Sequence, residues 1–202
     1  LSQADAVTVI SQKVKKDLSQ FLDRKIHVIY NPVRDVYYDK NIKRENPFLF
    51  VGRAKDPNKR FNLIKESLLK IKDGEKKIIV CGEENPGFGN YLGYVSNNKL
   101  NELYNSTKYL LLPSKYEGIG LPMIEAMICG ALPLTCTDNE TAKEFLPSDF
   151  MCDSNVDSIL KHIENLDKNY KAKQEIAFKL AEKYKEQFNK TRIAKNILSV
   201  LK

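Results

Sequence analysis

The chain alternates between short apolar runs of strand length and longer stretches in which apolar residues recur at helical spacing. The run at 78–82 is apolar up to its final glycine, which is typical of a parallel strand buried on both faces. The stretch 61–72 carries apolar residues three or four positions apart, which predicts an amphipathic helix. Further strands are predicted at 27–30, 48–52, 91–95, 108–113 and 131–136. Further helices are predicted at 98–106, capped by Asn97, and at 156–166, 171–187 and 191–201.

This alternation predicts an α/β fold, with a Rossmann-like parallel sheet that carries helices on both faces. Ligands of such sheets bind at the carboxyl ends of the strands. Three segments of suitable chemistry follow predicted strands, and they begin at Gly52, Gly82 and Glu117. We therefore expect these three segments to meet in one binding site.

A glycine loop lies between the strand at 108–113 and the next predicted helix. Gly118 and Gly120 permit backbone conformations that a side chain forbids, so amide groups there can approach a ligand closely. Pro122 suits the first position of a helix, where its missing N–H costs nothing. The free N–H groups and partial positive charge at a helix start favour a phosphate, which makes this loop a candidate phosphate site.

Two carboxylates, Glu117 and Glu125, flank this loop and are separated by seven residues. Glu117 stands before the helix, and Glu125 stands about one turn inside it. Each carboxylate can hold hydroxyl groups on its own side of a bound phosphate, and a nucleotide sugar has this layout of ribose, diphosphate and hexose. The alternative is a plain strand-to-helix turn with two surface glutamates, which is common in α/β proteins.

The segment 114–127, SKYEGIGLPMIEAM, resembles the E-x7-E signature of retaining GT-B glycosyltransferases of family 4, the glycogen-synthase-like group. The resemblance implies one half of a GT-B fold, namely the C-terminal, donor-binding domain. It implies transfer of a hexose from a nucleoside-diphosphate sugar to an acceptor hydroxyl with retained configuration. Glu125 would hold the ribose and Glu117 the sugar. The loop residues between them that would complete the donor site are Gly118, Ile119, Gly120 and Leu121.

A strand that ends in Gly52 and Arg53, followed by Lys59, can place two cations over a diphosphate. In the family, the matching arginine and lysine neutralise the leaving diphosphate, so the resemblance gives Arg53 and Lys59 a catalytic role with Glu117. The family has glycine after the lysine, whereas this chain has Arg60. No D-x-D pair lies where a metal would be expected, which predicts a site without a metal and without a cofactor other than the donor. The alternative is that these residues are ordinary solvated cations.

Two further segments resemble the family in part. Tyr94 and Val95 lie in a stretch whose backbone meets the nucleobase in the family, and we expect Val95 at the base and Tyr94 in the core. Glu144 matches a family glutamate, but the glycine pair that precedes it in the family is absent.

The two ends of the chain resemble pieces of the other GT-B domain. The segment 4–11 resembles the last strand of the acceptor-side domain, and Asn31, Pro32 and Val33 resemble the interdomain crossover. The predicted division is a remnant of that domain at 1–25, a donor-binding domain at 26–187, and a returning C-terminal helix at 188–202.

The composition of the chain limits the kinds of ligand and surface that it is expected to bind. The net charge of +7 suits phosphate ligands or an anionic membrane surface, whereas no cluster of aromatic residues interleaved with basic ones argues for nucleic acid. No apolar run has membrane-spanning length and no signal pattern is seen, which predicts a cytoplasmic protein with peripheral membrane contact. The cysteines form no C-x-x-C pair, which predicts buried free thiols at Cys81, Cys129, Cys136 and Cys152.

The chain is thus expected to be an incomplete or weakly active hexosyltransferase whose acceptor, a saccharide, lipid or protein, meets a missing acceptor-side domain. An apolar helix face of Ile193, Ile197 and Leu201 would then stay open and favour self-association. One alternative is a non-catalytic nucleotide-sugar-binding module that needs a partner. Another is an epimerase of GT-B architecture, which the matched signature disfavours.

Overall fold

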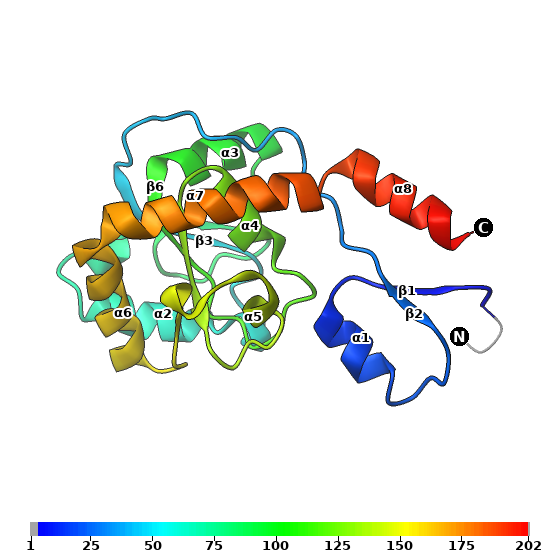
Figure 1. Cartoon of the computed structure of the whole chain (residues 1–202). Helices are drawn as coiled ribbons and strands as arrows, with labels where there is room; N and C mark the ends of the chain where they lie inside the picture. Colours follow the sequence, from blue (N-terminus) through cyan, green and yellow to red (C-terminus); the bar gives the residue numbers. More distant parts are fainter. Residues whose placement is uncertain (1–3, 202) are drawn as a thin grey trace.

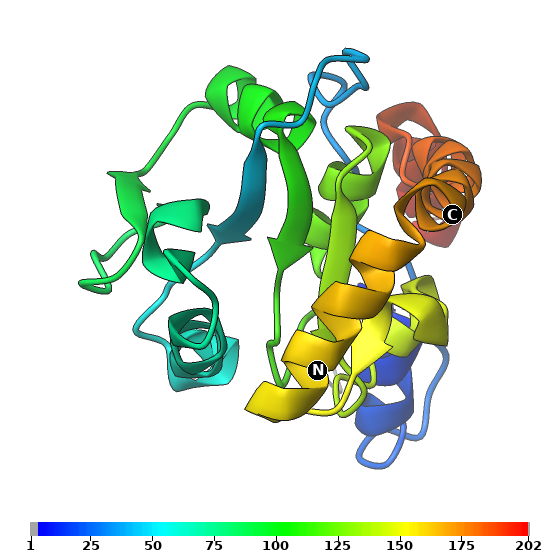
Figure 2. The ribbon, with the colours of Figure 1, turned by 90° about the vertical axis from the view of Figure 1, so that its left-hand side faces the viewer.

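The computed structural model describes residues 4–201, and its main body is a six-stranded parallel sheet with helices around it (Figures 1 and 2). The strand order is β5-β4-β3-β6-β7-β8. The strands are β3 Asn46–Val51, β4 Ile78–Cys81, β5 Asn90–Gly93, β6 Thr107–Leu111, β7 Leu132–Cys136 and β8 Met151–Cys152. This architecture confirms the predicted fold class.

The helices of the body are α2 Phe61–Leu69, α3 Asn97–Ser106, α4 Leu121–Ile128, α5 Ala142–Phe145, α6 Val156–Lys168 and α7 Tyr170–Gln187. Short 3-10 turns lie at η1 Pro57–Lys59, η2 Gly74–Lys77 and η3 Ser148–Phe150. Helix α2 packs against α6, and α4 packs against both α3 and α7. Helix α7 runs along the body in Figure 1 and covers α4, which carries one of the two predicted carboxylates.

Burial follows the apolar pattern closely. Leu49, Phe50, Val80 and Leu110, on the central strands, are fully buried. Helix α2 ends at Leu69 rather than at residue 72, because the chain turns back there. A side chain at Gly74 would come within 1.9 Å of the carbonyl oxygen of Leu68, so only glycine fits this turn. All four cysteines are buried and none forms a disulfide, as predicted.

A small unit precedes the body. It consists of β1 Val7–Val9, α1 Gln12–Leu18 and β2 Ile26–Val28, with β1 and β2 paired in their own two-stranded parallel sheet. Figure 1 shows it beside the body rather than within it. The strand expected near 27–30 therefore does not join the main sheet, and α1, α5 and β8 are elements that the apolar pattern did not predict.

Glu144 joins this unit to the body. Its Oε2 accepts a 2.9 Å hydrogen bond from the backbone N–H of Gln12, at the start of α1, and its Oε1 accepts a 2.7 Å bond from the hydroxyl of Tyr30. The division predicted at 1–25, 26–187 and 188–202 stays a prediction, and residues 1–3 and 202 lie outside the described range.

The last helix, α8 Lys190–Val200, extends away from the body in Figure 1. Ile197, Leu198 and Leu201 are exposed there. The prediction that Ile193 would be open is wrong, because this side chain is buried. Among residues 4–201, no helix combines the length and apolar character that crossing a membrane requires.

Candidate functional site

A cavity of about 320 Å³ lies at the carboxyl ends of β3 and β4, and we call it the strand-end cavity. Its volume lies in the usual range for small-molecule sites, about 300–1,000 Å³. Five of the predicted site residues line it: Gly52, Arg53, Lys59, Val95 and Glu125. It is also lined by residues that were not predicted as ligand contacts: Arg34, Tyr37, Cys81, Gly82, Glu83, Tyr94, Asn97, Leu100, Val51 and Pro122.

Two glycines shape the floor of this cavity. A side chain on Gly82 would come within 1.9 Å of the carbonyl oxygen of Gly52, so the ends of β3 and β4 can meet only without one. The backbone N–H of Gly52 donates to the carbonyl of Cys81 at 2.9 Å. The strand-end cavity lies at these two strand ends. Glu117, which was expected to share this site, does not line the cavity.

Glu125 is the buried carboxylate of the site. Helix α4 carries it one turn past Gly120, and only 6% of the residue is exposed. The hydroxyl of Tyr104 donates to its Oε2 at 3.1 Å. Burial raises the pKa of Glu125 to about 7, against the lowering effects of the Tyr104 hydrogen bond and the charge of Arg34. Within residues 4–201, Oε1 of Glu125 has no hydrogen-bond donor, so it is available to a ligand.

Glu117 lies apart from Glu125. Its Oε1 accepts from the ammonium group of Lys59 at 2.7 Å, and the side chains of both residues are mostly buried. Glu117 and Gly118 line a second cavity, of about 300 Å³, on the side of α1. Lys59 lines the strand-end cavity, so this ion pair connects the two spaces.

The rest of the glycine loop supports the site from outside the strand-end cavity. Ile119 is buried, Gly120 takes the left-handed conformation with φ 77° before α4, and Leu121 starts that helix. None of these three lines the cavity, and Pro122, the second helical residue, does. The structure therefore brings the helix start to the cavity through Pro122.

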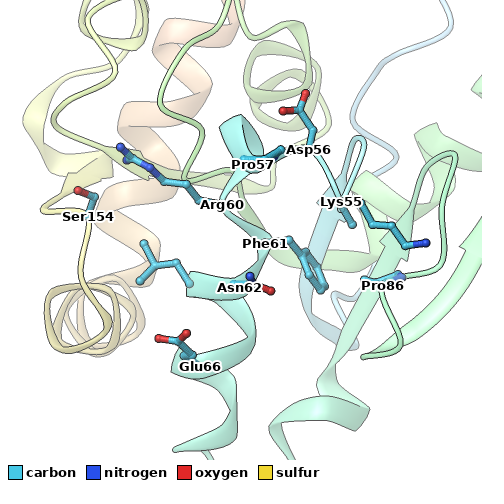
Figure 3. A pocket seen from close by; sticks show the side chains of 11 residues that line it. Lys55, Asp56, Pro57, Arg60, Phe61, Asn62, Glu66, Pro86 and Ser154 are labelled. Carbon is cyan, nitrogen blue, oxygen red and sulfur yellow. The ribbon is translucent and has the colours of Figure 1, made fainter.

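Two other basic residues lie close to Lys59 in the chain, and the structure places both outside the strand-end cavity. Lys55 and Arg60 line a larger cavity of about 590 Å³ around the start of α2. Figure 3 shows their side chains extending in opposite directions there. The two terminal nitrogens of Arg60 donate hydrogen bonds to the two carboxylate oxygens of Asp138, at 2.9 and 2.6 Å. None of the residues predicted for the site lines this larger cavity, so the strand-end cavity is the candidate site.

Arg53 is the other predicted cation. Its Nη2 donates to Oδ2 of Asp56 at 2.7 Å, and its side chain is 64% exposed. The other oxygen of Asp56 accepts from the backbone N–H of Asn58 and so caps η1. Arg53 is thus held at the rim of the cavity and remains accessible to an anion.

The segment between β2 and β3, residues 29–45, which we call the crossover segment, forms one wall of the cavity. Its Arg34 donates to Oδ1 of Asn97 at 3.2 Å, and the hydroxyl of its Tyr37 donates to the same oxygen at 3.4 Å. The ring of Tyr37 packs edge-on against Tyr104, with 5.8 Å between the ring centres. Burial and the nearby charge of Glu125 raise the pKa of Tyr37 to about 12.

Two sequence-based assignments near β5 are wrong. Tyr94 is 83% exposed at the cavity rim, rather than in the core, because it follows the end of β5, the edge strand of the sheet. Asn97 does not cap α3. The cap is Ser96, whose hydroxyl accepts from the backbone N–H of Lys99 at 3.2 Å. Asn97 is the first residue of that helix, and its side chain is directed to Arg34 instead.

Comparison with known proteins fits this arrangement. The sequence profile of the family described as "Glycosyl transferases group 1" matches residues 89–191. The chain is also 29% identical over 182 residues to the O-antigen chain mannosyltransferase RfbU of Salmonella typhimurium, a match that covers 79% of this chain and 51% of that protein. The chain therefore belongs to the group 1 family of glycosyl transferases, and it spans about half the length of this curated relative.

Solved structures show the same fold. Sucrose-phosphate synthase from Thermosynechococcus elongatus superposes with a TM-score of 0.83 at 17% identity, over 98% of this chain and 58% of that one. The Anabaena protein Alr3699/HepE, solved in complex with UDP and glucose, gives 0.81 at 16% identity, over 98% and 63%. These neighbours are GT-B glycosyltransferases, so the parallel sheet with its helices is one half of a GT-B fold.

Proposed function

We propose that this chain is the donor-binding part of a retaining glycosyltransferase that moves a hexose from a nucleoside-diphosphate sugar to an acceptor hydroxyl. The observation that carries the proposal is the position of Glu125. A buried carboxylate with one free oxygen lies in the same cavity as two cations, Arg53 and Lys59, and apolar Val95. Glu125 suits a ribose, the two cations suit a diphosphate, and Val95 suits a base.

Each residue has a distinct task in this proposal. Glu125 accepts hydrogen bonds from the ribose hydroxyls, while Arg53 and Lys59 bind the diphosphate. Negative charge builds up on the diphosphate as its bond to the sugar breaks, and cations already in place stabilise that charge. Glu117 binds the hexose from the opposite side of Lys59, and N–H groups at the start of α4 near Gly120 hold phosphate or sugar oxygens.

The proposal assigns charge neutralisation to these cations and not to a metal. We therefore expect donor binding to be the same with magnesium and with a chelator. A strict requirement for a divalent ion would contradict this part of the proposal.

For the sugar and acceptor, the named relative is the guide. RfbU is named an O-antigen chain mannosyltransferase, and the HepE structure contains UDP and glucose. We propose mannose as the first hexose to test, with a saccharide chain as acceptor. The net charge of +7 supports the further proposal that the whole protein acts in the cytoplasm at an anionic membrane surface.

Calorimetric titration with UDP-glucose, UDP-GlcNAc and GDP-mannose tests the donor site. Glu125→Ala should weaken binding even of the free nucleoside diphosphate, since each lost charge-assisted hydrogen bond is worth about 1.5–3 kcal/mol before water compensates. Arg53→Ala and Lys59→Ala should weaken the binding of nucleoside diphosphates far more than the binding of nucleosides. Added salt should also weaken diphosphate binding. Lys55→Ala is the matched control, because Lys55 lies outside the strand-end cavity. Unchanged affinity in the Glu125 variant would contradict the proposal.

Release of labelled sugar distinguishes an enzyme from a binding module. We expect slow hydrolysis of the donor by this chain and little transfer, because holding an acceptor in line can supply several kcal/mol of barrier reduction. The described residues hold the donor side only. Binding with no release at all would favour a non-catalytic nucleotide-sugar-binding module. Efficient acceptor-dependent transfer by the monomer would contradict the assignment to the donor side alone.

A further inference from the structure

The side chain of Asn97 has a fixed orientation at the strand-end cavity. The guanidinium of Arg34 has donors and no acceptor, so the atom of Asn97 that it touches, 3.2 Å away, must be the carbonyl oxygen. The hydroxyl of Tyr37 supplies a second donor to that oxygen, at 3.4 Å. The amide nitrogen of Asn97 donates to no other residue in the described part of the chain. It is therefore a free hydrogen-bond donor on a residue that lines the cavity.

Asn97 lies at the end of the cavity that suits a base, a placement that rests on the proposed function. Arg53 and Lys59 follow β3, whereas Val95, Asn97 and Leu100 belong to the connection from β5 and the first turn of α3. A nucleotide with its ribose on Glu125 and its diphosphate at the cations directs its base toward these α3 residues. Val95 and Leu100 offer apolar contact to the ring faces, and Asn97 is the polar group among them.

We infer that Asn97, oriented by Arg34 and Tyr37, selects nucleotides whose base presents a keto oxygen over nucleotides whose base presents an amino group. Its amide N–H donates to the oxygen at position 4 of uracil or position 6 of guanine. In cytosine and adenine an amino group occupies the same position. Two donors would then face each other, and the bound base would shield the exposed Asn97 amide from water without giving it an acceptor. Sites built to hydrogen-bond a ligand group reject the analogue that lacks it.

Two matched pairs of nucleotides test this inference on the chain itself. UDP and CDP differ at position 4 of the pyrimidine, and IDP and ADP differ at position 6 of the purine, so ring size is constant within each pair. We expect UDP to bind at least about tenfold more tightly than CDP, and IDP at least about tenfold more tightly than ADP. Equal affinities within both pairs would overturn the inference and leave the donor site intact. If none of the four nucleotides binds, both the inference and the proposed function are wrong.

Three variants locate the effect. Asn97→Ala should bring both ratios to within about twofold of one, because no oriented donor remains. Asn97→Asp presents an oxygen in place of the nitrogen, so CDP should bind at least as well as UDP. The double variant Arg34→Ala/Tyr37→Phe removes both donors to Oδ1 and lets the amide rotate, so the ratios should also fall. Circular dichroism confirms that each variant is folded.

Asn98→Ala is the control, since Asn98 is the next residue of α3, is exposed like Asn97, and lies outside the cavity lining. It should keep the native ratios of UDP to CDP and of IDP to ADP. Because each result is a ratio within one variant, a general loss of affinity does not imitate the predicted change. Native ratios in a folded Asn97→Ala variant would assign the selection to another group and overturn the inference.

Discussion

The ammonium group of Lys59 lies 2.7 Å from Oε1 of Glu117, and the two side chains are only 17% and 11% exposed. In the proposed mechanism these two groups bind different parts of the donor, the diphosphate and the hexose. Here they bind each other. The diphosphate of a donor sugar must therefore compete with Glu117 for Lys59. Once Lys59 binds the diphosphate, Glu117 is free to bind the hexose.

Glu117→Gln should accordingly have different effects on the affinities contributed by the nucleoside diphosphate and by the hexose. The variant removes a competitor for Lys59, so affinity for the free nucleoside diphosphate should be unchanged or raised, while the added affinity given by the hexose should fall. Calorimetry with GDP and GDP-mannose, or UDP and UDP-glucose, measures both quantities. Glu84→Gln, at an exposed loop position, is the control for loss of a negative charge. A large loss of affinity for the nucleoside diphosphate in Glu117→Gln would contradict this arrangement.

Donor binding should depend on pH through Glu125. Because burial raises its pKa to about 7, the carboxyl is about half protonated at neutral pH. Ribose hydroxyls donate to the ionised form, so affinity for a nucleotide sugar should rise from about pH 6 to about pH 8, with proton release on binding. Calorimetry in two buffers of different ionisation enthalpy measures the protons released.

A nucleotide sugar is the right probe for this pH dependence, because its diphosphate lacks the terminal phosphate ionisation, near pH 6, of a free nucleotide. Glu125→Gln should bind more weakly and without the proton release. If the native protein and this variant release equal numbers of protons, a group other than Glu125 is titrating.

The same residue should affect folding stability. The pKa of Glu125 in the folded protein, about 7, lies above its usual value of 4.5, so the folded state favours the protonated carboxyl. Stability from this group is fully present below about pH 4.5 and is lost as the pH rises through about 7, by about 3 kcal/mol in total. Urea unfolding should therefore show Glu125→Gln gaining stability relative to the native protein between about pH 5 and about pH 8. Parallel stability curves would contradict the raised pKa.

Arg44 should be a strong determinant of stability. Its guanidinium donates to the carbonyls of Tyr104, Asn105 and Thr107 at the end of α3 and of Cys129 at the end of α4, over 2.6–3.0 Å. Removal leaves buried carbonyl groups without donors, so Arg44→Ala should cost about 3 kcal/mol or more.

The urea midpoint measures this cost. Lys43→Ala is the matched control, because that side chain is 87% exposed and should change stability by less than about 0.5 kcal/mol. Equal midpoints for the two variants would show that water replaces the guanidinium at little cost.

The exposed apolar side chains of α8 should cause the chain to self-associate. Ile197, Leu198 and Leu201 face solvent in this chain, and contiguous exposed apolar surface favours association. Leu198→Glu should shift sedimentation toward the monomer. Asn196→Glu adds the same charge at an exposed polar position of the helix and should leave association unchanged. A native chain that remains monomeric at high concentration would contradict this prediction.

Sequence patterns predicted the elements of the main body well and those of the small unit that precedes it poorly. The continuous apolar run of β4 and the amphipathic face of α2 lie where expected, because burial on one or both faces imposes a local period on the residues. The pattern missed α1, which lies outside the main core and has no buried residue of its own. It also put β2 in the wrong sheet, because the sequence of a short apolar strand does not specify which strand it pairs with.

By itself, the sequence determined the α/β class, the glycine loop and the spacing that puts Glu125 one turn inside α4. These features depend on residues close together in the chain. Only the tertiary structure decided that Glu117 pairs with Lys59, 58 positions away, and that Arg34 turns the amide of Asn97, 63 positions away. The physical reason is that such contacts depend on where separate strands end in space. The spacing of residues within one element does not encode that position.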